Sequence, residues 1–378
     1  MEARPLKIFA ASNTSRLRYT ADLILGEILG LRWEIVTDKR KLGKHHVINY
    51  SCENIPDSLN IRPEGLLSEE GTRHHDIETG EWNRLPAIFI TRGDSDIPFD
   101  LFSAVFYLVT RYEEYLRHEP DQSGRFPASA SIAFRNGFLG IPVVDFWSRE
   151  LAVMLVKKFH NLTFRRKEFR RLTVIDVDIH VVTHKIMVMP VPEELSGEAS
   201  QFIREAKDID QDWNKEGKDF DEIIGYITEK AKNNNSELRL FFSLGDYGTV
   251  ILPEKKKHRV LIRRFSESGL IGLSFSGQAL PLQQQVESEF RELSELTGEA
   301  GRSVIFRWKA LSLPLSYRSL IQAGINEDFS MGYHDIPGFR AGISRPFFFM
   351  IWLRRGRHFF GSFRPMIHSQ PVKKVAQE

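Results

Sequence analysis

One apolar run that ends in two acids constrains this chain more than any other stretch. Residues 171–180 read Arg-Leu-Thr-Val-Ile-Asp-Val-Asp-Ile-His, and the apolar and β-branched residues before Asp176 predict a buried strand. Side chains two apart on a strand face the same way, so the carboxylates of Asp176 and Asp178 are expected to converge at its carboxyl end. Burying unpaired carboxylates is costly, which favours a metal ion or a cationic group beside them. The alternative is one Asp that caps a helix and a second Asp in solvent.

Strand-like and helix-like stretches alternate along the chain. In the second half, strands are predicted over three further segments: 238–244, 271–275 and 304–308. Helical patterns separate them, and this alternation predicts an α/β fold with a parallel sheet or barrel. Chemistry in such folds collects where strands end, which is where Asp176, Asp178 and Asp246 fall.

In the first half, residues 100–117 predict a long amphipathic helix, with Leu101, Val105 and Leu108 on one stripe. Charged side chains lie near the end of this helix, at Arg111, Glu113 and Glu114. They form either a buried ion network or part of the helix surface. Because charged side chains are usually exposed, we expect the surface arrangement.

Composition limits the compartment and the class of partner. The 378 residues leave room for two domains, and the basic cluster at 165–171 is expected to mark their boundary. The 52 basic and 50 acidic residues nearly balance, so net charge does not point to nucleic acid. Cys52 is the single cysteine, which excludes a disulfide framework and a cysteine-based zinc site. Without an apolar signal core or membrane-spanning run, we expect a cytoplasmic protein with no transmembrane segment.

Several motifs resemble, in the same order, bacterial proteins in which an uncharacterised N-terminal domain precedes a polysaccharide-deacetylase-like domain. The first-half motifs are residues 99–104, 107–115, 124–127 and 136–138. The second-half motifs are residues 176–178, 244–248, 327–333 and 338–342. The resemblance implies an N-terminal α/β domain over residues 1–168 and a complete or partial (β/α) barrel over 169–349. Residues 350–378 are then expected to form an irregular basic tail.

The resemblance implies a carbohydrate esterase that removes acetyl groups from N-acetylated polysaccharide or glycan by metal-dependent amide hydrolysis. By position, Asp176 is the general base, and Asp178 binds a divalent metal, expected to be zinc, that polarises the amide carbonyl. Arg340 matches the motif that pairs with and orients the base, the alternative being a surface or structural salt bridge. The substrate cleft is expected to include three further residues: Asp246, Tyr247 and Asp328.

Two metal-ligand positions of the family carry unsuitable residues here. One ligand histidine is expected after a Gly-Leu pair, where this chain has Ser274, and a second is expected where it has Arg307. Serine does not replace an imidazole as a zinc ligand, and arginine repels the cation. His180 and His184 have the spacing of a histidine pair but directly follow the opening motif. The resemblance therefore implies a degenerate copy with an incomplete catalytic set.

The end of the chain also departs from the family pattern. The family carries Phe-Tyr-Asp-Leu near a position where this chain has Met350-Ile351-Trp352, followed by basic residues. Codons TAT-GAT-TTG, read one base later, give ATG-ATT-TGG. We therefore hypothesise that several segments are translated out of frame, including 185–192, 274–275, 304–306 and 350–352. Resequencing the gene tests this hypothesis, and DNA that admits no such shifts would refute it. The alternative is a divergent member with a basic, membrane-surface tail.

Three functions follow from these observations. The first is a metal-dependent deacetylase or a degraded descendant of one. The second is a non-catalytic carbohydrate-binding protein that keeps the barrel cleft without the chemistry. The third is a nucleotide-sugar transferase, because an Asp-x-Asp pair at a strand end also suits a divalent cation on a diphosphate. No glycine-rich phosphate loop accompanies the acids, which lowers the third option.

Overall fold

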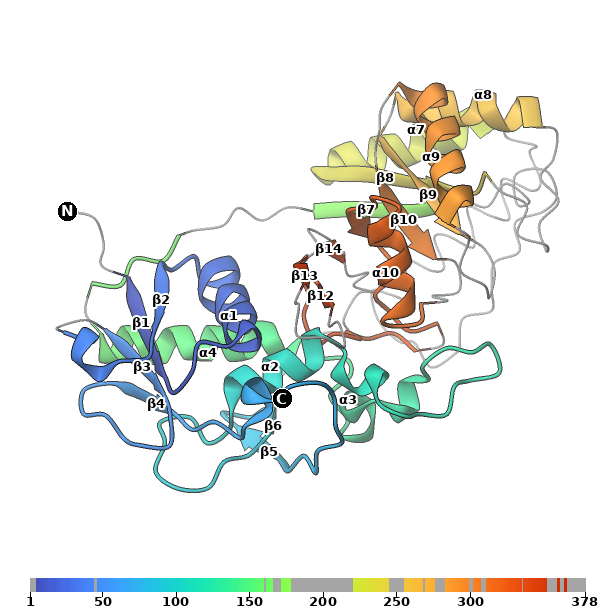
Figure 1. Cartoon of the computed structure of the whole chain (residues 1–378). Coiled ribbons are helices and arrows are strands. Elements are labelled where there is room, and N and C mark those ends of the chain that lie inside the picture. Colours follow the sequence, from blue (N-terminus) through green and yellow to red (C-terminus); the bar gives the residue numbers. More distant parts are fainter. Residues whose placement is uncertain are drawn as a thin grey trace, which may run out of the picture. The chain divides into compact units, whose positions relative to one another are not determined.

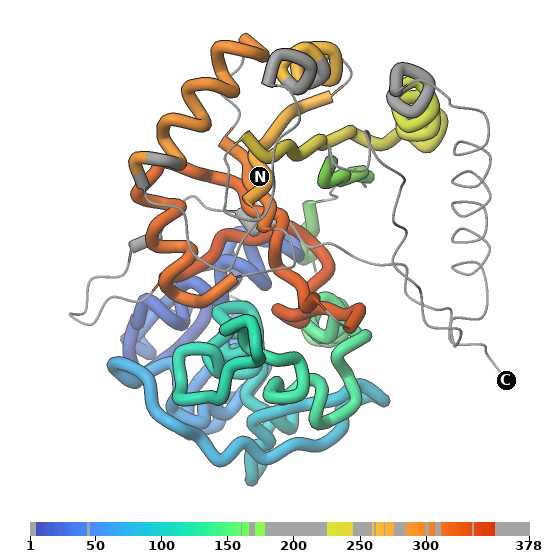
Figure 2. Tube along the Cα trace, turned by 90° about the vertical axis from the view of Figure 1, so that its right-hand side faces the viewer, coloured from blue at the N-terminus to red at the C-terminus, as the bar shows by residue number. Residues whose placement is uncertain are grey.

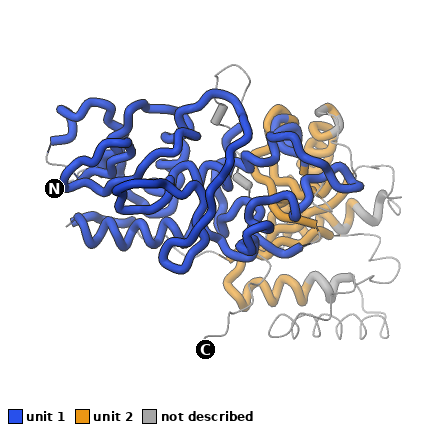
Figure 3. The backbone as a smooth tube through the Cα atoms, turned by 90° about the horizontal axis from the view of Figure 1, so that it is seen from below, with its two compact units in different colours: residues 1–168, 312–318, 335–367 blue, residues 169–311, 319–334, 368–378 orange. Residues whose placement is uncertain are grey.

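The chain folds as two α/β units, each built on a parallel sheet (Figure 1; Figure 3). The first unit comprises residues 1–168, 312–318 and 335–367, and the second comprises residues 169–311, 319–334 and 368–378. The computed structural model describes residues 5–43, 46–159, 161–165, 171–177, 220–244, 255–267, 269–275, 283–298, 302–306, 311–334, 336–351, 359–360 and 364–365. None of the helices within these ranges combines the length and apolarity that crossing a bilayer requires. The α/β class expected from the sequence is confirmed.

A four-stranded parallel sheet in the order β2-β1-β3-β4 organises the first unit. Both β1 and β3 are buried along their whole length, as central strands of a parallel sheet usually are. The elements up to the first helix after the sheet are β1 (Leu6–Ala10), α1 (Ser15–Ala21), η1 (Asp22–Ile28), β2 (Trp33–Val36), η2 (Lys39–Lys41), β3 (Val47–Tyr50), β4 (Leu59–Ile61), η3 (Leu66–Ser68), β5 (Thr79–Trp82), β6 (Leu85–Ile88) and α2 (Leu101–Val109). Those that follow are η4 (Tyr112–Tyr115), η5 (Ala128–Ala130), α3 (Ile132–Arg135) and α4 (Val143–Lys158).

Helix α2 lies in the core of the first unit. Its nine residues are apolar on every side apart from one serine, and all nine are buried. Asp100 caps the helix by accepting a hydrogen bond from the Ser103 backbone N–H at 3.0 Å. The helix predicted over residues 100–117 is wrong in its second half, because α2 ends at Val109. Arg111 then takes a left-handed backbone conformation (φ 54°), and the short 3-10 turn η4 follows.

A late stretch of the chain completes the first unit. The Phe339 N–H donates to the Leu139 carbonyl at 2.8 Å, and the Val144 N–H donates to the Gly342 carbonyl at 2.9 Å. A Cβ on Gly338 would lie 2.9 Å from the Leu139 carbonyl oxygen, so this close approach requires glycine. Residues 335–349, which the sequence analysis assigned to the barrel domain, therefore cluster with the first unit.

The start of the expected irregular tail forms a strand. Met350 and Ile351 make up β12 (Met350–Ile351), which is buried and pairs antiparallel with β13 (Phe359–Phe360). One more short strand follows, β14 (Arg364–Pro365). The other residues after Ile351 lie outside the described ranges.

In the second unit, five strands lie side by side in the order β7-β8-β9-β10-β11, and every pairing between them is parallel. Helices alternate with these strands along the chain, and α8 and α9 contact both each other and β9, as can be followed in Figure 2. The division between the two units falls inside α10. The elements are β7 (Arg171–Val177), α7 (Phe220–Asn233), β8 (Ser236–Phe242), α8 (Lys255–Ser266), β9 (Leu270–Phe275), α9 (Gln283–Thr297), β10 (Ser303–Phe306), α10 (Leu315–Gln322) and β11 (Glu327–Asp328).

The two faces of the second sheet have different neighbours. Phe242, at the end of β8, contacts Phe265 of α8 with ring centroids 5.2 Å apart, so its face packs against that helix. Phe241 precedes Phe242, so its side chain points to the opposite face of the sheet. There the centroid of its ring lies 4.9 Å from the ring centroid of Phe329. A Cβ on Gly272 of β9 would lie 2.4 Å from the Phe241 ring, so the ring occupies the space that the glycine leaves.

Candidate functional site

Asp176 lies one residue before the end of β7, on the face opposite α8. It pairs in register with Phe241, whereas Val177 pairs with Phe242. Register partners in a parallel sheet point to the same side, so Asp176 shares the Phe241 face. Asp176 is therefore a half-buried carboxylate near the carboxyl edge of a parallel sheet, as the sequence predicted. The expected burial of the strand is not observed, because every residue of β7 is half-buried or exposed among the described part of the chain.

Two serines continue this face toward the carboxyl edge. Phe242 pairs with Leu273, so Ser243 and Ser274 are the next residues along and alternate back to the face of Asp176. Ser274 is fully buried, and Ser243 is 3 % exposed. The Ser243 Oγ has no hydrogen-bond partner within the described part of the chain. Sequence reasoning missed Ser243, although the alternation from Phe241 was a signal that could have found it.

Asp328 occupies a different place in the sheet from Asp176. The strand register connects Asp328 of β11, through the residues paired across β8, β9 and β10, with Val177 of β7. The side chain of Asp328 therefore points to the face of the sheet opposite that of Asp176. Its carboxylate is fully buried and accepts a hydrogen bond from Ser330 Oγ at 2.5 Å. That hydroxyl in turn accepts from the Phe306 N–H at 2.7 Å. Asp328 therefore helps to join the ends of β10 and β11, and its role in a substrate cleft stays a prediction.

The remaining predicted residues of this edge lie outside the described ranges: Asp178, Asp246, Tyr247, His180, His184 and Arg307. Within those ranges, no three His, Cys, Asp or Glu side chains gather into a group that could hold a metal. The described donors at the edge are one carboxylate and two hydroxyls, whereas zinc sites use three or four Cys, His or acidic ligands. The described residues alone therefore do not fit zinc.

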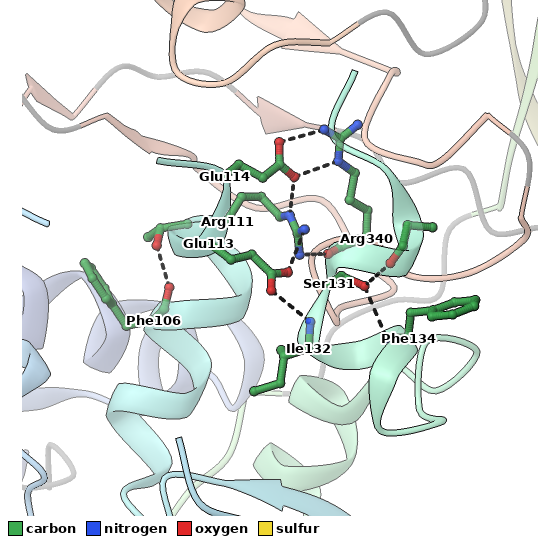
Figure 4. A network of polar contacts seen from close by, with 10 residues as sticks. Phe106, Arg111, Glu113, Glu114, Ser131, Ile132, Phe134 and Arg340 are labelled. Atoms are coloured by element: carbon green, nitrogen blue, oxygen red, sulfur yellow. Dashed lines mark hydrogen bonds and ion pairs between the residues drawn. The ribbon is translucent and has the colours of Figure 1, made fainter. Parts of the chain in front are cut away.

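Arg340 lies in a buried ion network of the first unit (Figure 4). Its Nε and Nη2 donate to the two carboxylate oxygens of Glu114 at 2.8 and 2.7 Å. Arg111 Nε donates to Glu114 at 2.7 Å, and Arg111 Nη2 donates to Glu113 at 2.9 Å. The third donor group of Arg111, Nη1, donates to the Arg340 carbonyl. All four side chains are buried, so the surface arrangement expected for residues 111–114 is wrong.

The left-handed conformation of Arg111 explains why this network forms. It ends α2 and turns the chain, so that Glu113 and Glu114 return toward the Arg111 guanidinium. A non-glycine residue in this conformation is strained by about 1–2 kcal/mol. Three hydrogen bonds from the guanidinium, two of them to carboxylates, offset that strain.

The two glutamates have opposite electrostatic environments. Burial alone would raise the pKa of Glu114, but the Arg340 and Arg111 guanidiniums outweigh it and hold the pKa below its ordinary value. Burial raises the pKa of Glu113, which Arg111 and the Ile132 N–H, 2.8 Å away, only partly oppose. Glu114 is therefore the carboxylate that both buried guanidiniums hold in its ionised form.

The guanidinium group of Arg340 forms a bidentate ion pair with Glu114. This bidentate geometry fixes the plane of both groups, which is what the sequence analysis expected an arginine at this position to do for a carboxylate. Arg340 thus forms a structural salt bridge with Glu114 within the first unit, which is one of the alternatives that the sequence left open. The role of Arg340 in orienting Asp176 stays a prediction.

Comparison with known proteins bears on the first unit. Residues 6–160 match a family of unknown function, DUF7033. The matched stretch lies within the N-terminal domain expected from the sequence over residues 1–168, and it contains the α2 helix and both glutamates of the buried network. No curated protein and no solved structure gave a significant match to the chain.

Proposed function

We propose that the second unit is a polysaccharide-deacetylase-like half barrel that binds an N-acetylated glycan at the carboxyl edge of its sheet, with the metal chemistry incomplete. The observation that supports this most directly is the shared face of Asp176, Ser243 and Ser274 at that edge. Ligands of α/β folds bind outside the carboxyl ends of parallel strands. A carboxylate and two hydroxyls there are suited to the hydroxyl and acetamido groups of a sugar, which both donate and accept hydrogen bonds.

Ser274 favours binding over the metal-dependent reaction. The family resemblance implies a ligand histidine at this position, and this chain has a fully buried serine there. A neutral hydroxyl is not among the usual ligands of protein zinc sites. The zinc prediction rests on Asp178 and on further residues outside the described ranges, and it is testable by metal analysis.

Hydrolysis of the acetamide is the second candidate function, because Asp176 lies at a strand end. A carboxylate there can accept the proton of a water molecule that adds to the amide carbonyl. The carbon–nitrogen bond then breaks as that proton passes from the carboxyl group to the leaving nitrogen, which leaves acetate and a free amine on the sugar. This candidate needs a complete catalytic set, whereas binding needs only the cleft.

Isothermal titration calorimetry of the full chain with tetra-N-acetylchitotetraose tests the proposal. We expect the unmodified chain to bind and Asp176→Asn to weaken binding by roughly 10- to 100-fold, because a hydrogen bond to a charged group is lost. Glu237→Gln is the matched control, since Glu237 lies in β8 on the same face but near the amino end of the sheet. The Glu237→Gln variant should bind tetra-N-acetylchitotetraose with the same Kd as the unmodified chain. An unmodified chain that does not bind tetra-N-acetylchitotetraose would overturn the proposal.

Two further measurements on the same preparation separate the candidates. Elemental analysis gives the metal content of the purified chain, and an enzymatic assay measures acetate released from the oligosaccharide. Bound zinc at one ion per chain, with acetate release that Asp176→Asn abolishes, would establish the deacetylase. Glycan binding without either signal would establish the binding protein.

A further inference from the structure

Ser243 is a buried hydroxyl whose hydrogen-bonding capacity is unused. The residue is 3 % exposed, and its Oγ has no hydrogen-bond partner among the residues that the structure describes. Folded proteins rarely leave a buried polar side chain unpaired, because it loses its hydrogen bonds to water without replacement. An unpaired hydroxyl of this kind indicates a position that a bound molecule completes.

Other hydroxyls of the same sheet are paired. Ser330 accepts a hydrogen bond from the Phe306 N–H at 2.7 Å and donates to Asp328 at 2.5 Å. Ser303 donates to Glu327 at 2.7 Å. Thr173 on β7 and Ser236 on β8 are likewise hydrogen-bonded to each other at 2.7 Å, so the unpaired Oγ of Ser243 departs from the pairing of these hydroxyls.

The position of Ser243 relates it to the candidate site. It directly follows β8, the strand that pairs with β7, and it lies two residues beyond Phe241 on the same face. From the strand spacing and the rise per residue, its Cα lies roughly 8 Å from that of Asp176. A ligand that contacts the Asp176 carboxylate from the carboxyl edge therefore also reaches the Ser243 hydroxyl.

The chemistry of these two groups is complementary. An ionised carboxylate only accepts hydrogen bonds, whereas a serine hydroxyl can donate one. An acetamido group presents one N–H and one carbonyl oxygen, so it needs one acceptor and one donor. Asp176 and Ser243 supply that pair on adjacent strands.

We infer that the Ser243 hydroxyl donates a hydrogen bond to the acetamido carbonyl of the bound sugar, while Asp176 accepts from its N–H. This inference rests on the proposed function and assigns to Ser243 the discrimination between acetylated and deacetylated glycan. A deacetylated sugar lacks the carbonyl oxygen, so Ser243 contributes nothing to its affinity.

Calorimetry of Ser243→Ala in the full chain, with tetra-N-acetylchitotetraose and with chitotetraose, tests the inference. We expect Kd for the acetylated oligosaccharide to rise roughly 10-fold and Kd for the deacetylated one to stay the same. Because the hydroxyl is unpaired without ligand, the urea midpoint of Ser243→Ala should equal or exceed that of the unmodified chain. Ser243→Cys, which keeps the volume but donates only weakly, should show the same loss of affinity.

Ser330→Ala is the matched control. Its hydroxyl is buried in the same sheet but paired, so the urea midpoint should fall while both Kd values stay unchanged. An unchanged Kd in Ser243→Ala would overturn the inference, as would a fall in its urea midpoint, because the hydroxyl would then be paired within the fold. An unmodified chain that does not bind the acetylated oligosaccharide would instead refute the proposed function, and the inference with it.

Discussion

Glu114→Gln is the substitution whose effect on stability follows most directly from the structure. Glu114 accepts three hydrogen bonds of 2.7–2.8 Å from Arg111 and Arg340, and all three side chains are buried. The substitution leaves two buried guanidiniums with one glutamate, Glu113. Removing one partner of a buried ion pair costs about 3–5 kcal/mol, because a buried charge is left uncompensated.

Urea unfolding of the full chain, followed by tryptophan fluorescence, measures this loss. Trp82 and Trp147 are both buried in the first unit and report on its transition. With a denaturant slope of roughly 2–3 kcal/mol per molar urea, the midpoint of that transition should fall by roughly 1–2.5 M. Combining Glu114→Gln with Arg340→Met restores the charge balance, so the double variant should recover part of the lost stability.

Glu113→Gln is the matched control within the same turn. Burial raises the pKa of Glu113, which means that its ionised form is already disfavoured in the fold. Its loss should therefore cost less than the loss of Glu114. Equal midpoints for the two single variants would refute the reasoning, as would a Glu114→Gln midpoint no lower than that of Asp38→Asn, which removes half of an exposed ion pair.

Three further predictions concern pH, a turn and the second sheet. Because the pKa of Glu114 is lowered in the fold, its stabilisation is complete above the pKa of an unfolded glutamate and is lost as pH falls through the folded value. Glu114→Gln should thus lose less stability than the unmodified chain on acidification, and parallel urea-midpoint curves against pH would contradict this. The β5–β6 hairpin turns at Asn83 and Arg84, which have φ of 51° and 64°, so Arg84→Gly should stabilise the chain by about 0.5–1 kcal/mol. A lower urea midpoint would speak against the turn assignment. Gly272→Ala should destabilise the second unit by about 1–3 kcal/mol in urea unfolding, since its Cβ would lie 2.4 Å from the Phe241 ring, and an unchanged transition would rule out that packing.

The sequence by itself determined the elements whose signal is local. The run before Asp176 predicted β7, and the alternation of apolar strands with helices predicted the α/β class, because burial patterns repeat over a few residues. The same pattern placed Asp176 at a carboxyl edge. The sequence pattern did not predict that α2 ends at Val109, because the residues after Val109 keep a helical spacing of apolar side chains. The helix is interrupted by the left-handed backbone conformation of Arg111.

Only the tertiary structure decided how the polar groups pair. Arg340 and Glu114 are 226 residues apart in the chain, and no local pattern links a glutamate in a 3-10 turn to an arginine in a distant loop. Without that partner, the charges at residues 111–114 resemble an exposed helix surface, since buried charges are rare. The unpaired hydroxyl of Ser243 is likewise visible only once strand register fixes its neighbours, because burial and hydrogen bonding at a sheet edge depend on strands that are distant in sequence.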